Sequence, residues 1–259
     1  MKATPPFALC LAILLLAGCS TPAAAQDPAP TVVDPAAEAR NAKPPNIIVF
    51  FADDMGYADL SCFGSTTCFT PNLDELADEG LRFTNFYSAS PGCSPSRAAL
   101  LTGCYPQRVG MPTVIGPGTD YGLNPDETTI PELLRQRGYA TAMVGKWHVG
   151  YGADHLLPLN HGFDEYLGLP YSNDMWPSGP VRFKKQYPHL PLIEDDEIIA
   201  QVRDQTYMTT WITERAARFI DESTTKKAPF FLYLAHPQPH VPLYVSPKHQ
   251  GSSEQGMYG

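Results

Sequence analysis

The chain has 259 residues, of which 43% are hydrophobic and 17% charged, and this composition excludes a wholly disordered protein. No segment repeats with a period of about 20 to 50 residues, so solenoids and propellers are excluded. The length predicts one large domain, or one and a half. The formal net charge is -9 and no run of Lys and Arg is longer than two residues, so we expect no nucleic-acid partner.

The N-terminus has the features of an export signal. A short charged start precedes an apolar run at 7–17, which is too short for a permanent membrane span and is followed by small residues. The segment Leu16-Ala17-Gly18-Cys19 looks like a bacterial lipobox, in which the cysteine is acylated and becomes the first mature residue. We therefore predict a lipoprotein signal peptide at 1–18; ordinary cleavage after 23–25 is the alternative. The predicted location is the periplasm or cell envelope, and Ser20 after the cysteine favours the outer membrane.

Residues 19–45 are expected to form a tether. They are mainly Ala, Pro, Thr and Asp, with few large apolar residues, and cannot build a core. Globular sequence is expected from 46 to 259, where the cysteines are too few for a disulfide scaffold. Cys62 and Cys68 could pair across a short loop or remain two buried thiols.

Apolar runs and helical patterns alternate along the globular part. The expected strands are 47–51, 81–87, 139–144 and 230–235. The expected helices are 70–79, 96–102, 130–137 and 201–222. This alternation predicts an α/β fold with a mostly parallel central sheet flanked by helices. In such sheets the functional site lies beyond the carboxyl ends of the strands.

Polar residues follow three of these strands. Asp53 and Asp54 offer hard oxygen ligands suited to Ca²⁺ or Mg²⁺, although a helix cap or a solvated turn would also explain them. If strand 139–144 continues, Lys146 and His148 point to the same side and pair a cation with a titratable base. With the 236–240 stretch, these groups are expected to converge.

The run from Cys93 to Gly103 is the most informative motif. A cysteine stands just before an expected helix N-terminus, which favours anions, and Arg97 follows one turn later. The run reads Cys-x-Pro-x-Arg and then Ala-x-Leu-x-Thr-Gly, which is the sulfatase signature. The chain resembles the type I, formylglycine-dependent sulfatase family, and within it the arylsulfatase A and galactosamine-6-sulfatase branch. Further matches follow in family order at 46–57, 70–74, 145–148, 161–164, 169–172 and 229–242.

The resemblance implies an alkaline phosphatase-like fold and hydrolysis of sulfate monoesters, either aryl sulfates or sulfated sugars. It implies that a formylglycine-generating enzyme oxidises Cys93 to Cα-formylglycine, whose hydrate is the nucleophile. A gem-diol can take sulfate on one oxygen and release it by deprotonating the other, so the aldehyde reforms. Asp53, Asp54 and the modified Cys93 would bind the cation, Ca²⁺ or possibly Mg²⁺.

The same resemblance implies the roles of the other site residues. Arg97 and Lys146 would hold the hydrate and offset the sulfate charge, because charge-assisted hydrogen bonds are strong. His148 would be the base that releases sulfate. His240 would bind sulfate or assist the leaving group, and Ser172 would join it and Lys146 in substrate binding.

The chain departs from the family pattern after the His240 stretch. The family's later Asp-Asn or Asp-His metal pair, its second lysine and its C-terminal region have no counterpart up to Gly259, so we expect the N-terminal portion of a longer sulfatase. Two alternatives stay open: a phosphomonoesterase or phosphonate hydrolase of the same superfamily, and an inactive fragment that binds sulfated glycans. The matches at 146–148 and 170–172 favour sulfate. The acidic run 194–197 is expected to be a solvated loop.

Overall fold

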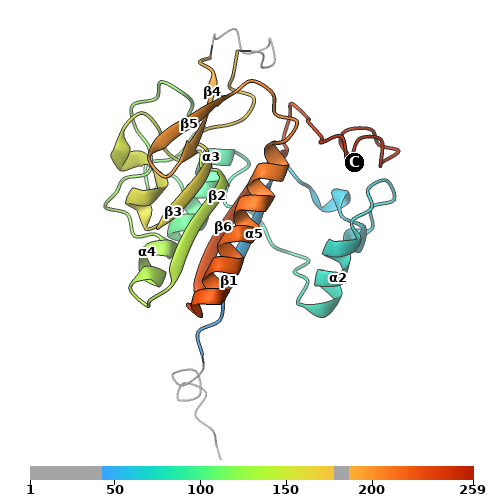
Figure 1. The fold of residues 1–259 in the computed structure, drawn as a ribbon, viewed down its shortest axis with the longest axis horizontal. Helices are drawn as coiled ribbons and strands as arrows, with labels where there is room; N and C mark the ends of the chain where they lie inside the picture. Colours follow the sequence, from blue (N-terminus) through green and yellow to red (C-terminus); the bar gives the residue numbers. More distant parts are fainter. Residues whose placement is uncertain (1–42, 178–186) are drawn as a thin grey trace, which may run out of the picture. The chain divides into compact units, whose positions relative to one another are not determined.

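The computed structural model describes residues 43–177 and 187–259 (Figure 1). The predicted signal peptide at 1–18 and the predicted tether up to residue 42 lie outside these residues. Within the described ranges, no helix combines the length and the apolar character that crossing a lipid bilayer requires.

A six-stranded sheet forms the centre of the fold. The strand order is β1 (Ile47–Asp53), β6 (Phe230–Pro239), β2 (Ala140–Lys146), β3 (Glu165–Leu169), β4 (Leu190–Glu194) and β5 (Glu197–Val202). The first four strands in this order are parallel, whereas β4 runs antiparallel to both β3 and β5. The prediction of a mostly parallel sheet is therefore confirmed. The acidic run 194–197 is exposed, as expected, but only residues 195–196 form a turn, because Glu194 ends β4 and Glu197 begins β5.

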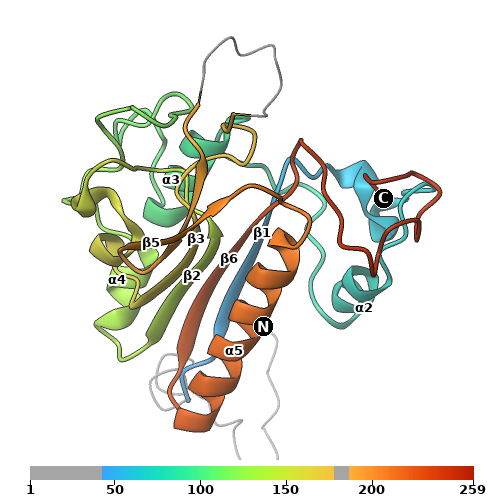
Figure 2. The same ribbon diagram turned by 45° about the horizontal axis from the view of Figure 1, so that its top comes forward.

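The α-helices in the described residues are α2 (Pro71–Glu79), α3 (Cys93–Thr102), α4 (Ile130–Arg135) and α5 (Met208–Lys226). Helix α5 lies along the sheet and contacts β6 and β2 (Figure 2). Its buried face is built from Ile212, Ala216 and Phe219, which are spaced by four and three residues as a helical stripe requires. Helix α3 ends at Gly103, whose left-handed conformation is typical of a helix C-terminus.

The core has two layers, one on each face of the sheet. Because successive side chains of a strand point to opposite faces, β6 contributes to both layers. Phe231 and Tyr233 pack in the layer that includes α3, whereas Leu232 and Leu234 pack in the layer that includes α5. Strand β6 is thereby buried on both faces, which explains its continuous apolar sequence.

Several expected elements need correction. The segment 81–87 is exposed irregular chain rather than a strand. Helix α5 begins at Met208 and not at residue 201, because residues 201–202 pair with β4 as the end of β5. Strand β1 was expected to be buried, but it lies at the sheet edge, where the side chains of Ile48 and Phe50 remain 49% and 54% exposed.

Candidate active site

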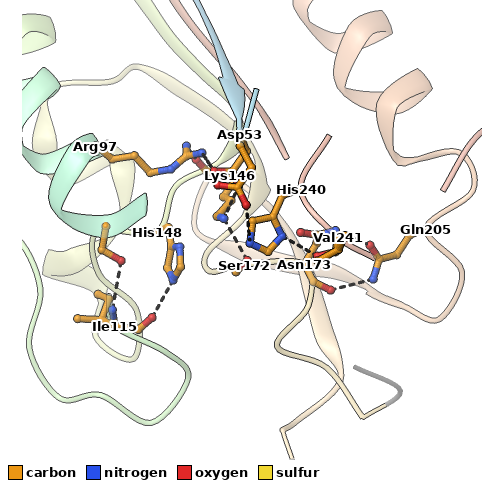
Figure 3. A network of polar contacts seen from close by, with 12 residues as sticks. Asp53, Arg97, Ile115, Lys146, His148, Ser172, Asn173, Gln205, His240 and Val241 are labelled. Atoms are coloured by element: carbon orange, nitrogen blue, oxygen red, sulfur yellow. Dashed lines mark hydrogen bonds and ion pairs between the residues drawn. The ribbon is translucent and has the colours of Figure 1, made fainter. Parts of the chain in front are cut away.

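The polar residues predicted to converge do so at the carboxyl ends of β1, β2 and β6 and in the loop after β3. Figure 3 shows Asp53, Arg97, Lys146, Ser172 and His240 gathered in one network. These side chains therefore lie at and beyond the carboxyl ends of the parallel strands, where α/β sheets of this kind carry their functional sites.

Two glycines bring the strand ends close together. A Cβ atom on Gly145 would lie 2.0 Å from the carbonyl oxygen of Ala235, and one on Gly168 would lie 1.7 Å from the carbonyl oxygen of Gly145. Neither position can hold a side chain without separating β6, β2 and β3. Gly145 also has a φ of 116°, which strongly favours glycine. These glycines set the backbone position of Lys146, the next residue of β2.

Arg97 connects α3 to these strand ends. Its fully buried guanidinium donates a hydrogen bond from Nη1 to the backbone oxygen of Lys146 at 2.5 Å, and its Nη2 lies 3.4 Å from Oδ1 of Asp53. The Cζ atom lies 5.3 Å from the centre of the Phe51 ring, within the range of a cation–π contact. Burial opposes the charge, but Tyr233 and Asp53 nearby hold the pKa of Arg97 above its ordinary value. Arg97 is therefore a fixed buried cation.

Asp53 and Lys146 form a buried ion pair. The Lys146 ammonium contacts Oδ2 of Asp53 and donates a second hydrogen bond to Oγ of Ser172 at 3.0 Å. Burial alone would raise the pKa of Asp53, but the charges of Lys146 and Arg97 outweigh it and hold the pKa below its usual value. Asp53 is therefore an ionised carboxylate enclosed by two cations.

His148 is fully buried, and its ring has a defined tautomer. Nε2 lies 2.7 Å from the carbonyl oxygen of Ile115, which can only accept, so Nε2 carries the proton. The lone pair is then on Nδ1, which has no hydrogen-bond partner among the described residues. Burial and the charges of Lys146 and Arg97 hold the pKa of His148 well below its ordinary value. The imidazole is neutral near pH 7 and can accept a proton at Nδ1.

The geometry before His148 differs from the expectation. Strand β2 ends at Lys146, and His148 has a φ of 59°, in the left-handed region. The two side chains therefore do not continue the alternation of a strand. Lys146 reaches Asp53, and His148 turns toward the loop that carries Ile115.

His240 approaches the second carboxylate. Its Nε2 lies 3.6 Å from Oδ2 of Asp54, and its Nδ1 donates to the carbonyl oxygen of Val241 at 2.6 Å. Asp54 follows β1 in a left-handed conformation and remains largely exposed. His236, by contrast, stacks on Phe50 with ring centres 5.0 Å apart, so of the 236–240 histidines only His240 contacts the carboxylate pair.

Cys93 is the first residue of α3, three positions before the expected helix start. It is partly buried and lies one turn before Arg97, so the two share a face of the helix. Oγ of the neighbouring Ser94 accepts a hydrogen bond from the Ile115 backbone at 3.2 Å, which ties α3 to the loop that holds His148. Cys62 and Cys68 are free, partly buried thiols, as is Cys93.

The residues present fit the implied formylglycine and the type of cation. Nε and Nη2 of Arg97 are buried without hydrogen-bond partners in the described chain, apart from the ion pair of Nη2 with Asp53, so they can donate to oxygens of a hydrate or a sulfate. Nδ1 of His148 is likewise without a partner there and can accept a hydrogen bond from a hydroxyl of the hydrate. Asp53 and Asp54 supply the oxygen ligands that Ca²⁺ or Mg²⁺ prefers. Across 43–177 and 187–259 no cluster of three or more His, Cys, Asp and Glu side chains has metal-binding geometry.

Sequence comparison places this site in a known family. The sulfatase family model matches residues 45–258. The chain is 39% identical over 241 residues to human arylsulfatase A, covering 84% of this chain and 46% of the relative. It is 39% identical over 234 residues to pig N-acetylgalactosamine-6-sulfatase, covering 84% and 44%.

Comparison with solved structures also finds sulfatases. The PsFucS1 sulfatase from Pseudoalteromonas sp. superimposes with a TM-score of 0.74 at 31% identity, covering 86% of this chain and 49% of that one. The chain therefore spans about half the length of the relatives it matches. Because the family model covers most of the chain and includes every site residue described above, this protein belongs to the sulfatase family.

Proposed function

We propose that the chain carries the nucleophile-bearing part of a sulfuric ester hydrolase of the arylsulfatase type. One observation carries the proposal: Arg97 of the Cys93 signature is buried against Asp53 and Lys146, residues that the sequence separates widely. The site combines two buried cations with a neutral base, and sulfate ester hydrolysis requires both kinds of group. Family membership supports the same activity.

Formylglycine at position 93 and a divalent cation, which sulfatases generally use, would supply a gem-diol nucleophile and a Lewis acid. Asp53 and Asp54 would hold the cation, together with residue 93. Arg97 and Lys146 offset the negative charge of a sulfate group, and their fixed positions avoid the cost of reorganising during the reaction.

The remaining residues move the proton and orient the ester. His148 accepts a proton at Nδ1, and the Ile115 carbonyl keeps this nitrogen unprotonated by holding the proton on Nε2. Ser172 is fixed by Lys146 and offers its hydroxyl to the sulfate. His240, beside Asp54, is placed to bind sulfate or to protonate the leaving oxygen.

The test compares kcat/KM for an aryl sulfate and an aryl phosphate on the same chain, with Cys93→Ala as the control. A sulfatase gives the higher value with the sulfate ester, and Cys93→Ala abolishes it. A higher value with phosphate would support the related phosphomonoesterases instead. Sulfated-glycan binding without turnover of either ester would support a fragment that only binds.

We also propose that the protein is exported and held on the cell envelope by a lipid on Cys19, with residues 19–45 as the tether. The lipobox-like segment Leu16-Ala17-Gly18-Cys19 supports this location. A formylglycine-generating enzyme would be the partner that modifies Cys93, because the Cys-x-Pro-x-Arg context is what such enzymes recognise.

A further inference from the structure

The loop after β3 contains a buried amide that the proposed mechanism does not use. Asn173 is fully buried and directly follows Ser172 of the site. Its Oδ1 atom has no hydrogen-bond partner in the described parts of the chain. A buried polar atom without a partner is uncommon in folded proteins and points to a missing ligand or water.

A second buried amide fixes the orientation of this side chain. Nε2 of Gln205 donates to the backbone oxygen of Asn173 at 2.9 Å, and because that oxygen can only accept, the orientation of the Gln205 amide is determined. Oε1 of Gln205 must then accept from Nδ2 of Asn173, at 3.1 Å. Oδ1 is therefore the side-chain atom of Asn173 that has no partner in the described chain, whereas Nδ2 donates to Gln205.

The residue that carries this acceptor directly follows Ser172, one of the proposed anion-binding residues. Ser172 is bonded to Lys146, and Figure 3 shows Asn173 beside Gln205, to which its amide donates. Asp174, the next residue, is also buried and has a second acceptor, Oδ1, without a partner in the described chain. These two neighbouring residues therefore carry unpaired buried acceptors, whereas Arg97 and Lys146 carry donors.

Two acceptors cannot bind sulfate, whose oxygens also accept. They require hydrogen-bond donors on the rest of the substrate. A sugar has several hydroxyl groups, and an amino sugar adds an amide N–H, whereas a simple aryl ring has no donor. A site with an unpaired buried acceptor favours a partner that supplies a donor over an analogue that lacks it.

Building on the proposed sulfatase function, we propose that Asn173 is a specificity residue that accepts a hydrogen bond from a hydroxyl or amide N–H of a sugar. The preferred substrate class is then a sulfated sugar rather than an aryl sulfate. Gln205 is a positioning residue, because it acts only through the orientation of Asn173.

The experiment measures binding to the purified chain by calorimetry, with Ca²⁺ present and three probes: galactose 6-sulfate, phenyl sulfate and inorganic sulfate. Asn173→Leu removes the acceptor and keeps a side chain of similar size. Gln205→Met removes the amide that orients Asn173. Asn160→Leu is the matched control, because Asn160 is exposed and bonds only the Asp154 carbonyl. Thermal unfolding of each variant establishes that it is folded.

We expect the unsubstituted chain to bind galactose 6-sulfate more tightly than phenyl sulfate. Asn173→Leu should weaken the binding of galactose 6-sulfate about tenfold, which is the usual effect of one lost neutral hydrogen bond. The affinities for the other two probes should not change. Gln205→Met should produce a smaller loss of affinity, again only for galactose 6-sulfate. This variant tests the proposal if Asn173→Leu does not fold.

An equal loss of affinity for all three probes would show that Asn173 has a structural role and would overturn the inference. Unchanged binding of galactose 6-sulfate would overturn it as well. In both cases the unsubstituted chain still binds inorganic sulfate and phenyl sulfate, so the proposed function survives. Failure of the unsubstituted chain to bind any of the three would instead contradict the proposed function itself.

Discussion

The guanidinium of Arg97 donates to the backbone oxygen of Lys146 at 2.5 Å, so helix α3 is bonded to the last residue of strand β2 inside the protein. The same guanidinium approaches Asp53 at the end of β1. One side chain thus joins three elements near the start of helix α3. Its loss should affect both stability and catalysis.

Replacing Arg97 by Met should lower the free energy of unfolding by about 3 kcal/mol, because breaking a buried charged network leaves its partners uncompensated. Urea unfolding followed by fluorescence measures this change. Arg135→Met is the matched control: Arg135 pairs with Asp164 at 3.1 Å, but both side chains are 40% exposed or more. That pair should contribute less than about 1 kcal/mol. Equal effects of the two substitutions would contradict the role assigned to Arg97.

Cys93 should be converted to formylglycine when the chain is produced with a formylglycine-generating enzyme. Peptide mass spectrometry should then show a loss of about 18 mass units at this residue, since a thiol is replaced by an aldehyde. Cys104, two residues after the end of the same helix, should keep its thiol and provides the internal control. Finding only the thiol at position 93 would exclude the proposed nucleophile.

His148→Gln should separate two roles of this residue, proton acceptance at Nδ1 and the hydrogen bond to the Ile115 carbonyl. A glutamine amide can still donate to the Ile115 carbonyl, so stability should change little, but it cannot accept a proton at neutral pH. We expect kcat to fall at least about 100-fold, as for loss of a general base. Steady-state kinetics and thermal unfolding together check this. Full activity of a stable His148→Gln protein would show that another group accepts the proton.

Acid should destabilise the protein partly through His161. This side chain is fully buried beside Trp147, and burial, with a smaller effect of His155, lowers its pKa to about 4. The folded pKa lies below the unfolded value of about 6.5, so the folded state binds fewer protons in this window. The stabilisation is present above about pH 6.5 and is lost as the pH falls toward about 4.

Between about pH 7 and about pH 5 this residue should contribute a loss of about 2 kcal/mol in the free energy of unfolding. His161→Phe keeps a ring at this position and removes the titration, so its unfolding curves should depend less on pH. The exposed His249→Gln control should retain the full dependence. Identical pH dependence of the His161→Phe and unsubstituted proteins would contradict the assignment.

Cys19→Ser should abolish lipid labelling and detergent partitioning in a bacterial host, because the acylated atom is the cysteine sulfur. Cys10→Ser, within the apolar run, should leave both unchanged. Metabolic labelling with a fatty-acid analogue measures the difference. Unchanged labelling of Cys19→Ser would disprove the lipobox interpretation and favour cleavage after 23–25.

The convergence of residues from different strands was easier to predict from the sequence than the contacts that each side chain makes. Asp53 and Lys146 end parallel strands, and parallel strand ends meet at one edge, so their convergence was predictable. Ser172 was expected only from the family resemblance, because the strand before it, β3, was not predicted. The tautomer of His148 was not, because it depends on the carbonyl of Ile115, which has no sequence signal. The buried contact of Arg97 with Phe51 was missed for the same kind of reason.

The errors in the fold have physical causes. Residues 81–87 are rich in aromatic and apolar side chains, but strand propensity needs a pairing partner, and this segment pairs with no strand in the described chain. The β4–β5 hairpin was missed because its charged turn at 195–196 dominated the pattern. Because this hairpin was missed, the expected start of α5 at residue 201 lies seven residues before the observed start at residue 208.

The edge position of β1 also has a consequence for handling the protein. Its sequence Ile-Ile-Val-Phe-Phe-Ala-Asp combines high β-propensity with one charge, and Ile48 and Phe50 face solvent. Such an edge is a template on which strands from other molecules can add, leading to aggregation. A lysine at Phe50 would place a charge on that face and oppose edge-to-edge association. Concentrated solutions of the chain should therefore scatter light more strongly than those of Phe50→Lys.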